Sequence, residues 1–180
     1  MSATTTTSTS TSALKVVVLS GAGFNCDEES VAAYARLGAQ ARTVHVLDWL
    51  RGDASLRGAD LVHVPGGFSF GDKLGSGKAL AARLRYGKAF DEVRGLSRDG
   101  VHWLGICNGF QVLTQCGLLP NLSGSFEHEA SLVVNRSGRF EDRWVRCRGA
   151  GVLSGESFEL PVRHGEGRLV YRDDATRDSA

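Results

Sequence analysis

The stretch Trp103–Gln111, WLGICNGFQ, places a cysteine between two glycines, where an apolar strand is expected to end and a helix to begin. Its centre, Gly105-Ile-Cys107-Asn-Gly109, has the G-x-nucleophile-x-G spacing of a nucleophile elbow. In such an elbow a strand turns sharply into a helix and holds the nucleophile in a strained backbone conformation. A cysteine here can also be a core residue, half of a disulfide or a metal ligand, so the rest of the chain has to be considered.

The chemistry of this turn favours a nucleophile. Glycines avoid steric clashes in a tight turn. The start of the following helix brings N–H groups and the positive end of the helix dipole to the sulfur, which favours the reactive thiolate. The N–H of Asn108 would point toward an oxyanion formed on a substrate. A single cysteine is more often inert packing, but two glycines at this junction lead us to expect a nucleophile at Cys107.

The other three cysteines, Cys26, Cys116 and Cys147, lack this context. Cys116 lies late in the expected helix, and we expect it in the core. The four cysteines form no CxxC pair, so we expect no metal site. The N-terminus has no basic and no apolar segment of a secretory signal. These features favour a cytoplasmic protein with reduced thiols.

The composition is typical of a globular protein. Hydrophobic residues make up 42% and charged residues 23% of the 180 residues, enough for one domain with a sizeable core. The formal net charge of +1 gives no strong field that would attract nucleic acid or a membrane surface. No apolar run is long enough to span a membrane. We therefore expect neither nucleic acid nor membrane as a partner.

The first two thirds of the chain alternate between apolar strands and helical patterns. The run Leu14–Ser20, LKVVVLS, is continuously apolar and β-branched, as in a buried parallel strand. Further strands are expected over Ala41–Leu47, Ala59–Phe68 and Val101–Cys107, and helices over Val31–Gly38, Ser76–Gly87, Gly87–Gly100 and Asn108–Gly117. This order predicts an α/β fold with a mostly parallel sheet and helices on both faces.

The pattern changes after Pro120. Four short, partly alternating segments predict an antiparallel C-terminal extension or an edge of the sheet: Ser131–Asn135, Arg143–Gly149, Ser157–His164 and Gly167–Arg172. For the polar ending, YRDDATRDSA, we expect no closing strand or helix. In domain terms, residues 1–13 are expected to be a disordered polar tail, and residues 14–180 a single domain.

Two further segments can supply groups to a site at Cys107. Val64–Asp72, VPGGFSFGD, follows a buried strand, and its paired glycines let a backbone N–H approach a ligand. It is equally typical of a simple turn. Pro161–Arg168, PVRHGEGR, contains a histidine and a carboxylate, His164 and Glu166, that share one face if the segment is extended. They could be a base and its orienting group, or an ordinary polar strand end.

Together these segments resemble class I, triad-type glutamine amidotransferases, and most closely the glutaminase subunit of phosphoribosylformylglycinamidine synthase. The resemblance covers roughly Leu14–Tyr171, and its elements occur in the family's order: GFNCD (23–27), VPGGFSFGD (64–72), GICNGFQVLT (105–114), GLLP (117–120) and HGEGR (164–168). It implies a flavodoxin-like α/β domain. It also implies a glutaminase reaction, in which a cysteine attacks the side-chain amide of glutamine, forms a thioester and releases ammonia.

The resemblance also implies roles for single residues. Cys107 matches the family's nucleophile, and Gly67 and Asn108 match its backbone oxyanion donors. Gln111 matches a residue that helps hold the glutamine. The chain itself is expected to hold no cofactor, because ATP and Mg²⁺ are used by a separate synthetase subunit. L-glutamine, that synthetase and a small accessory subunit are the implied partners.

The chain departs from the family at one place. These glutaminases carry a catalytic histidine and glutamate in a Pro-His-Pro-Glu segment, and the chain, whose only prolines are Pro65, Pro120 and Pro161, has none. The resemblance places His164 and Glu166 near the site but does not make them this pair. We expect a C-terminally truncated or impaired form with little glutaminase activity on its own. The alternative is a non-catalytic subunit that binds glutamine or the synthetase.

Overall fold

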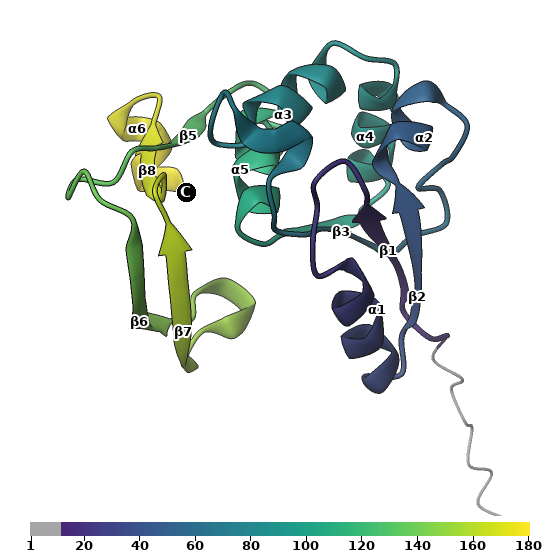
Figure 1. Cartoon of the computed structure of the whole chain (residues 1–180), viewed down its shortest axis with the longest axis horizontal. Helices are drawn as coiled ribbons and strands as arrows, with labels where there is room; N and C mark the ends of the chain where they lie inside the picture. Colours follow the sequence, from purple (N-terminus) through teal and green to yellow (C-terminus); the bar gives the residue numbers. More distant parts are fainter. Residues whose placement is uncertain (1–11) are drawn as a thin grey trace, which may run out of the picture.

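A four-stranded parallel sheet forms the framework of the α/β part of the protein (Figure 1). In the computed structural model, residues 12–180 are described, except for the side chain of Val152. The sheet order is β2-β1-β3-β4, which is a flavodoxin-like order. The strands are β1 (Lys15–Ser20), β2 (Gln40–His45), β3 (Leu61–Val64) and β4 (His102–Gly105). The predicted fold class is confirmed, whereas residues 1–11 of the predicted tail lie outside the described residues.

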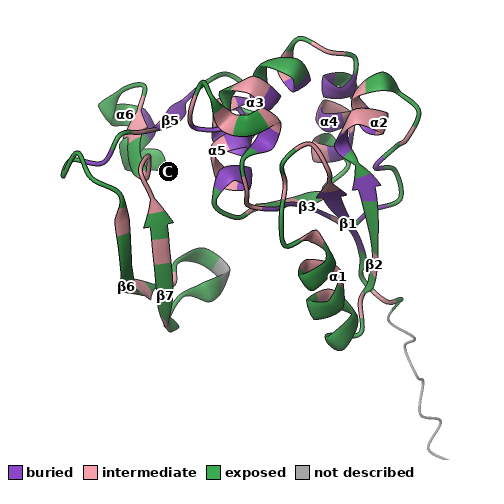
Figure 2. Cartoon of the chain, viewed as in Figure 1, coloured by how far each residue is buried: buried purple, intermediate pink, exposed green. Residues whose placement is uncertain are grey.

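Helices cover the two faces of the sheet unequally. One face carries α1 (Asp27–Arg36), which contacts β1 and β2 but buries none of its own residues (Figure 2). The other face carries α2 (Val46–Arg51), α3 (Lys78–Arg85), α4 (Ala89–Arg98) and α5 (Asn108–Gln115). On this second face Val17 and Leu19 of β1 pack into the main apolar core. Val64, at the carboxyl end of β3, belongs to that core, and the candidate site is built from the ends of β3 and β4.

The C-terminal part consists of antiparallel strands, as predicted. β5 (Ala130–Val133) pairs with β8 (Arg168–Tyr171), and β6 (Glu141–Arg148) pairs with β7 (Ser157–His164). The described strands of this part pair with one another, in two separate two-stranded sheets, and not with the edge of the parallel sheet. The β6–β7 hairpin extends away from the α/β part (Figure 1). Two short 3₁₀ turns, Ser69–Asp72 and Gly151–Leu153, complete the element order.

One strand ends earlier than the sequence predicted, because a helix follows the strand directly. The strand expected over Ala41–Leu47 ends at His45, and α2 begins at Val46. The His45 side chain accepts a hydrogen bond from the N–H of Leu47 at 3.3 Å, which starts the helix. Val46 and Trp49, three residues apart, are both buried in the core. This spacing is helical, but so short a helix has too few turns to show its period in the sequence.

One further strand is shorter than predicted, and one helix forms where the sequence predicted none. The strand expected over Ala59–Phe68 spans only Leu61–Val64, because Pro65 has no N–H to donate and the following glycines turn the chain. The polar ending is not irregular, since α6 (Asp174–Ser179) forms there. Asp173 caps this helix by accepting from the N–H of Thr176 at 2.7 Å. The sequence contains this cap, but no apolar period accompanies it.

A buried histidine lies on the α1 face of the sheet. His63 of β3 is 3% exposed, and its Nδ1 lies 3.3 Å from the hydroxyl of Tyr34 on α1. Its Nε2 is buried and has no hydrogen-bond partner among the described residues. Burial lowers the pKa of His63 below its ordinary value, because the charged imidazolium loses its hydration. Burial in the folded protein therefore favours the neutral ring.

His63→Leu is expected to reduce the loss of stability on acidification. Well above pH 6.5, the ordinary pKa of histidine, His63 is neutral in both the folded and unfolded chain. Below it the unfolded chain binds a proton that the folded chain does not, so the free energy of unfolding falls by at most about 1.4 kcal/mol per pH unit. Urea unfolding near pH 7 and near pH 5 measures this loss. His102→Leu, on an exposed histidine of β4, is the control; equal losses in wild type and His63→Leu would contradict the prediction.

Candidate active site

Cys107 occupies the sharp turn between β4 and α5. Its backbone angles are φ 53° and ψ −115°, a conformation that residues with a side chain rarely adopt. Its side chain is exposed, and its thiol is not in a disulfide. The first N–H groups of α5 follow directly, so the positive end of the helix lies beside the sulfur. The strained, exposed position has the geometry of a nucleophile elbow.

The two flanking glycines are required by close backbone packing. A Cβ on Gly109 would lie 1.9 Å from the carbonyl oxygen of Val64. A Cβ on Gly105 would lie 2.7 Å from the Cα of Phe110. Neither contact can be relieved by rotating a side chain, because all the atoms that are met belong to the backbone. The G-x-C-x-G pattern therefore reflects how tightly β4, the turn and α5 pack against the end of β3.

The Pro-Gly-Gly turn after β3 lies next to the sulfur. A Cβ on Gly66 would be 3.2 Å from the Cβ of Cys107 and 3.8 Å from its Sγ. Gly67 follows with φ 124°, a conformation that favours glycine. Among the described residues, neither the N–H of Gly67 nor that of Asn108 donates a hydrogen bond to a protein atom. Two unused N–H groups on segments that meet at Cys107 suit an oxyanion hole.

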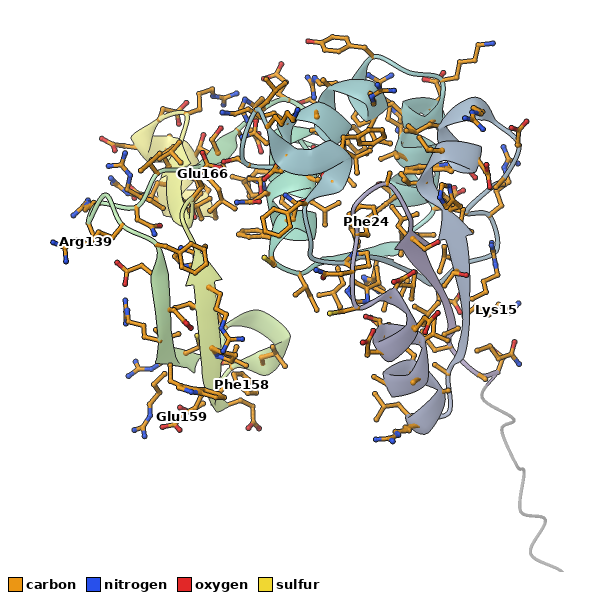
Figure 3. The ribbon with its side chains drawn as sticks, viewed as in Figure 1. Lys15, Phe24, Arg139, Phe158, Glu159 and Glu166 are labelled. Atoms are coloured by element: carbon orange, nitrogen blue, oxygen red, sulfur yellow. The ribbon has the colours of Figure 1, made fainter. Side chains whose placement is uncertain are left out.

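The loop after β1 holds the Pro-Gly-Gly turn in place. Phe24 and Gly67 form an antiparallel bridge (Figure 3 labels Phe24). On either side of it, the N–H of Asn25 donates to the carbonyl of Gly66 at 2.9 Å and the N–H of Phe68 donates to Gly23 at 2.8 Å. The sequence suggested no structural role for this loop. Only its glycines signal it, since a Cβ on Gly23 would lie 2.2 Å from the carbonyl oxygen of Phe68.

Hydrogen bonds of side chains connect Asn108 and Gln111. The Oδ1 of Asn108 accepts from the N–H of Ser69 at 3.0 Å, and its Nδ2 donates to the Oε1 of Gln111 at 3.0 Å. The Nε2 of Gln111 donates to the carbonyl of Glu166 at 3.0 Å. The side chain of Glu166, labelled in Figure 3, accepts a hydrogen bond at its Oε2 from the Ser76 hydroxyl at 2.6 Å. Gln111, on the helix that follows the elbow, is thus joined to the segment that carries Glu166.

His164 lies in a different set of contacts. Its Nδ1 is 3.0 Å from the Oδ1 of Asn135, and its carbonyl accepts from the Nδ2 of the same residue at 2.8 Å. Its ring packs against Gly167, where a Cβ would lie 2.2 Å from Nδ1. No described side chain, His164 included, forms a hydrogen bond with the sulfur of Cys107. His164 ends β7 and Glu166 lies in the turn beyond it, so the two do not share a strand face.

His164→Ala is expected to leave the reactivity of Cys107 within about twofold of wild type, because the ring contacts Asn135 and not the sulfur. The measurement is the second-order rate constant for alkylation of Cys107 by iodoacetamide, followed by mass spectrometry of peptides. His128→Ala, at a histidine whose ring bonds to Ser131, is the control. A tenfold or larger fall in the rate in His164→Ala alone would show that His164 serves as a base.

The remaining chemical features are few. Cys116 is 1% exposed, and burial raises the pKa of its thiol to about 12, so it belongs to the core as predicted. In the part of the chain that the structure describes, no three His, Cys, Asp or Glu side chains gather into a possible metal site. None of the described helices has the length and apolar character needed to cross a membrane.

Comparisons with known proteins identify the family of the chain. Residues 13–180 match the family described as CobB/CobQ-like glutamine amidotransferase domain. Among curated proteins, phosphoribosylformylglycinamidine synthase subunit PurQ of Methanococcus maripaludis strain C5 is 37% identical over 168 residues, covering 90% of this chain and 62% of that protein. The PurQ subunit of Halobacterium salinarum is 39% identical over 173 residues, covering 92% of this chain and 69% of that protein.

Two solved structures are similar. A chain in the structure of PurLQS from Thermotoga maritima has a TM-score of 0.72 and 30% identity, covering 91% of this chain and 72% of that chain. A glutamine amidotransferase from the same organism, at TM-score 0.54 and 15% identity, covers 89% of this chain and 64% of that chain and shows the fold alone. The chain spans about three fifths of the length of the first curated relatives that it matches.

Proposed function

The chain belongs to the CobB/CobQ-like glutamine amidotransferase family, and from that premise we propose that it is the glutaminase component of a phosphoribosylformylglycinamidine synthase. It would release ammonia from glutamine for the amidation of formylglycinamide ribonucleotide in purine biosynthesis. Its similarity to PurQ subunits over nine tenths of its length supports this assignment. The observation that carries it is Cys107, strained and exposed in its elbow with the Gly66-Gly67 turn against its sulfur.

The proposed first step is attack of the Cys107 sulfur on the side-chain amide carbon of glutamine. The S–C bond forms as the carbonyl becomes an oxyanion, which the N–H groups of Gly67 and Asn108 stabilise. When the tetrahedral intermediate collapses, the C–N bond breaks, and the proton that the thiol has given up leaves with the nitrogen as ammonia. Water then hydrolyses the γ-glutamyl thioester to glutamate and restores the thiol. Gln111 lies one helical turn beyond Cys107, close enough to contribute to the glutamine site.

The partners follow from this assignment. L-glutamine is the substrate of this chain, and the ammonia would pass to an ATP-dependent synthetase subunit that uses Mg²⁺, with a small accessory subunit in the complex. No cofactor is proposed for the chain itself. We place the complex in the cytoplasm, where reduced thiols are expected. Neither nucleic acid nor a membrane has a role in this proposal.

One observation favours a second candidate, an impaired or non-catalytic subunit. Among the described residues, no histidine forms a hydrogen bond with the Cys107 sulfur. A cysteine that is activated by the helix dipole alone is expected to react slowly. Removing the base from a unit of nucleophile and base lowers the reaction rate by several orders of magnitude. A chain of this kind could still bind glutamine or the synthetase.

The test combines the purified chain with an ATP-dependent synthetase subunit from a PurQ-containing complex and glutamine labelled with ¹⁵N in its side-chain amide. We expect ¹⁵N in the amidine product, slowly formed and absent with Cys107→Ser. Free ammonium should support amidation with either variant, which shows that the synthetase is active. Ammonium-supported amidation without any transfer from glutamine would overturn the proposed function in favour of the non-catalytic subunit.

A further inference from the structure

A continuous series of hydrogen bonds runs from the C-terminal part of the chain to the loop that carries Gly67. It begins at the Glu166 carbonyl, which accepts from the Nε2 of Gln111. It continues from the Oε1 of Gln111 to the Nδ2 of Asn108, and from the Oδ1 of Asn108 to the N–H of Ser69. Each of these three bonds measures 3.0 Å. Each end of the Gln111 amide and each end of the Asn108 amide therefore makes one hydrogen bond within the protein, and each NH2 group keeps a second N–H.

Glu166, at one end of this series, is held in a fitted position. Its Oε2 accepts from the Ser76 hydroxyl at 2.6 Å, and Ser76 is fully buried. A Cβ on Gly75 would lie 2.7 Å from its Oε1, so the carboxylate rests directly against the backbone before α3. The Ser76 hydroxyl also lies 2.9 Å from the carbonyl of Leu132 in β5. A charge-assisted bond of this kind is stronger than a neutral one, so it fixes the turn between β7 and β8.

We propose that Glu166 is a positioning residue for the oxyanion hole. Its carboxylate anchors the β7–β8 turn on Ser76, so that the Glu166 backbone carbonyl holds Gln111. Gln111 in turn orients Asn108, which holds the oxyanion hole. Asn108 supplies one of the two N–H groups of that hole. Its side chain also holds Ser69, two residues beyond Gly67, which supplies the other. The Asn108 side chain thus connects the two segments that carry the N–H donors, and Gln111 sets the orientation of this side chain.

Without the anchor, the turn is expected to move away from Gln111. The freed Gln111 amide would no longer orient Asn108, and the N–H of Ser69 would lose a partner that is 1% exposed. A buried N–H without its acceptor is unfavourable, so the loop would shift to relieve it. Displacing a reacting group by about 1 Å can cost up to about a hundredfold in rate. The oxyanion-binding role of the two N–H groups rests on the proposed function. The structural link from Glu166 to Ser69 does not.

The test of the coupling needs no activity. In the full chain, amide hydrogen exchange at Ser69 is compared between wild type, Glu166→Ala and Glu166→Gln. We expect exchange at Ser69 to rise at least about tenfold in Glu166→Ala, at an unchanged urea midpoint, and to stay near wild type in Glu166→Gln, which keeps an acceptor for Ser76. Glu159→Ala, which removes an exposed glutamate paired with Arg146 on the β6–β7 hairpin, is the matched control. Unchanged exchange at Ser69 in Glu166→Ala would overturn the proposal.

A second measurement separates this coupling from the proposed function. Cys107 is alkylated by iodoacetamide, which forms no oxyanion, and by a diazoketone analogue of glutamine, which uses the hole. In Glu166→Ala the ratio of the analogue rate to the iodoacetamide rate is expected to fall about tenfold, and Glu166→Gln should restore it. A wild-type chain that the analogue never labels contradicts the proposed function, whereas equal ratios in wild type and Glu166→Ala contradict the positioning role.

Discussion

Gly109→Ala is expected to prevent native folding or to lower the free energy of unfolding by more than about 4 kcal/mol, the range reached by severe steric clashes in a core. The added methyl would lie 1.9 Å from the carbonyl oxygen of Val64 and 2.7 Å from that of Pro65. Both are backbone atoms at the end of a buried strand, so the clash can be relieved only by moving α5 away from β3. The soluble yield and the urea midpoint of the purified chain measure the effect.

Gly95→Ala is the matched control for this substitution. Gly95 lies within α4, and a Cβ there would meet no atom within 4 Å. Alanine is favoured over glycine in a helix by roughly 0.5–1 kcal/mol, so this variant should be slightly more stable than wild type. A Gly109→Ala chain with a wild-type midpoint would mean that β4, the turn and α5 do not pack as described.

Cys107→Ser is expected to abolish the transfer of nitrogen from glutamine while leaving the fold intact. Serine is close in size to cysteine, but its hydroxyl is far less acidic, and no described histidine bonds to the side chain of residue 107 to remove its proton. Loss of a nucleophile that acts as part of a unit can cost about a millionfold in rate. The readout is glutamate formation in the presence of the synthetase, with free ammonium as the alternative nitrogen source.

The backbone strain at Cys107 predicts that replacing this residue with glycine makes the protein more stable. A non-glycine residue at φ 53° and ψ −115° is unfavourable by about 1–3 kcal/mol, so Cys107→Gly should raise the free energy of unfolding while removing all activity. Improved stability together with lost function is the signature of a strained functional residue. A Cys107→Gly chain that is no more stable than wild type would show that the elbow stores no strain.

Much of the α/β part could be predicted because its signals are local. The apolar run of β1 and the glycines around Cys107 reflect burial and steric packing within one strand or turn. α2 and α6 could not be predicted, since each spans only six residues and its start depends on one capping side chain, His45 or Asp173. Such caps are common in loops, so without an apolar period they do not identify a helix.

The members of the candidate site could be proposed from the sequence, but the contacts between them could not. The pattern around Cys107 and the Pro-Gly-Gly turn identified groups at the ends of neighbouring strands. No local pattern could show that Glu166 would contact Ser76, ninety positions away, or that His164 would bond to Asn135 instead. These contacts depend on how the antiparallel strands pack against α3 and α5. Tertiary packing, not sequence spacing, therefore decided which polar residues reach the elbow.

We propose that Cys107 is a nucleophile built to attack the amide of glutamine. The direct test exposes the purified chain to a diazoketone analogue of glutamine and maps the modified peptides by mass spectrometry. Cys26 is an internal control, because it is also exposed but begins α1 outside any elbow. One adduct is expected, on Cys107, and excess L-glutamine should prevent it. Labelling of Cys26 and Cys107 at equal rates, with no protection by glutamine, would contradict the proposed role of Cys107.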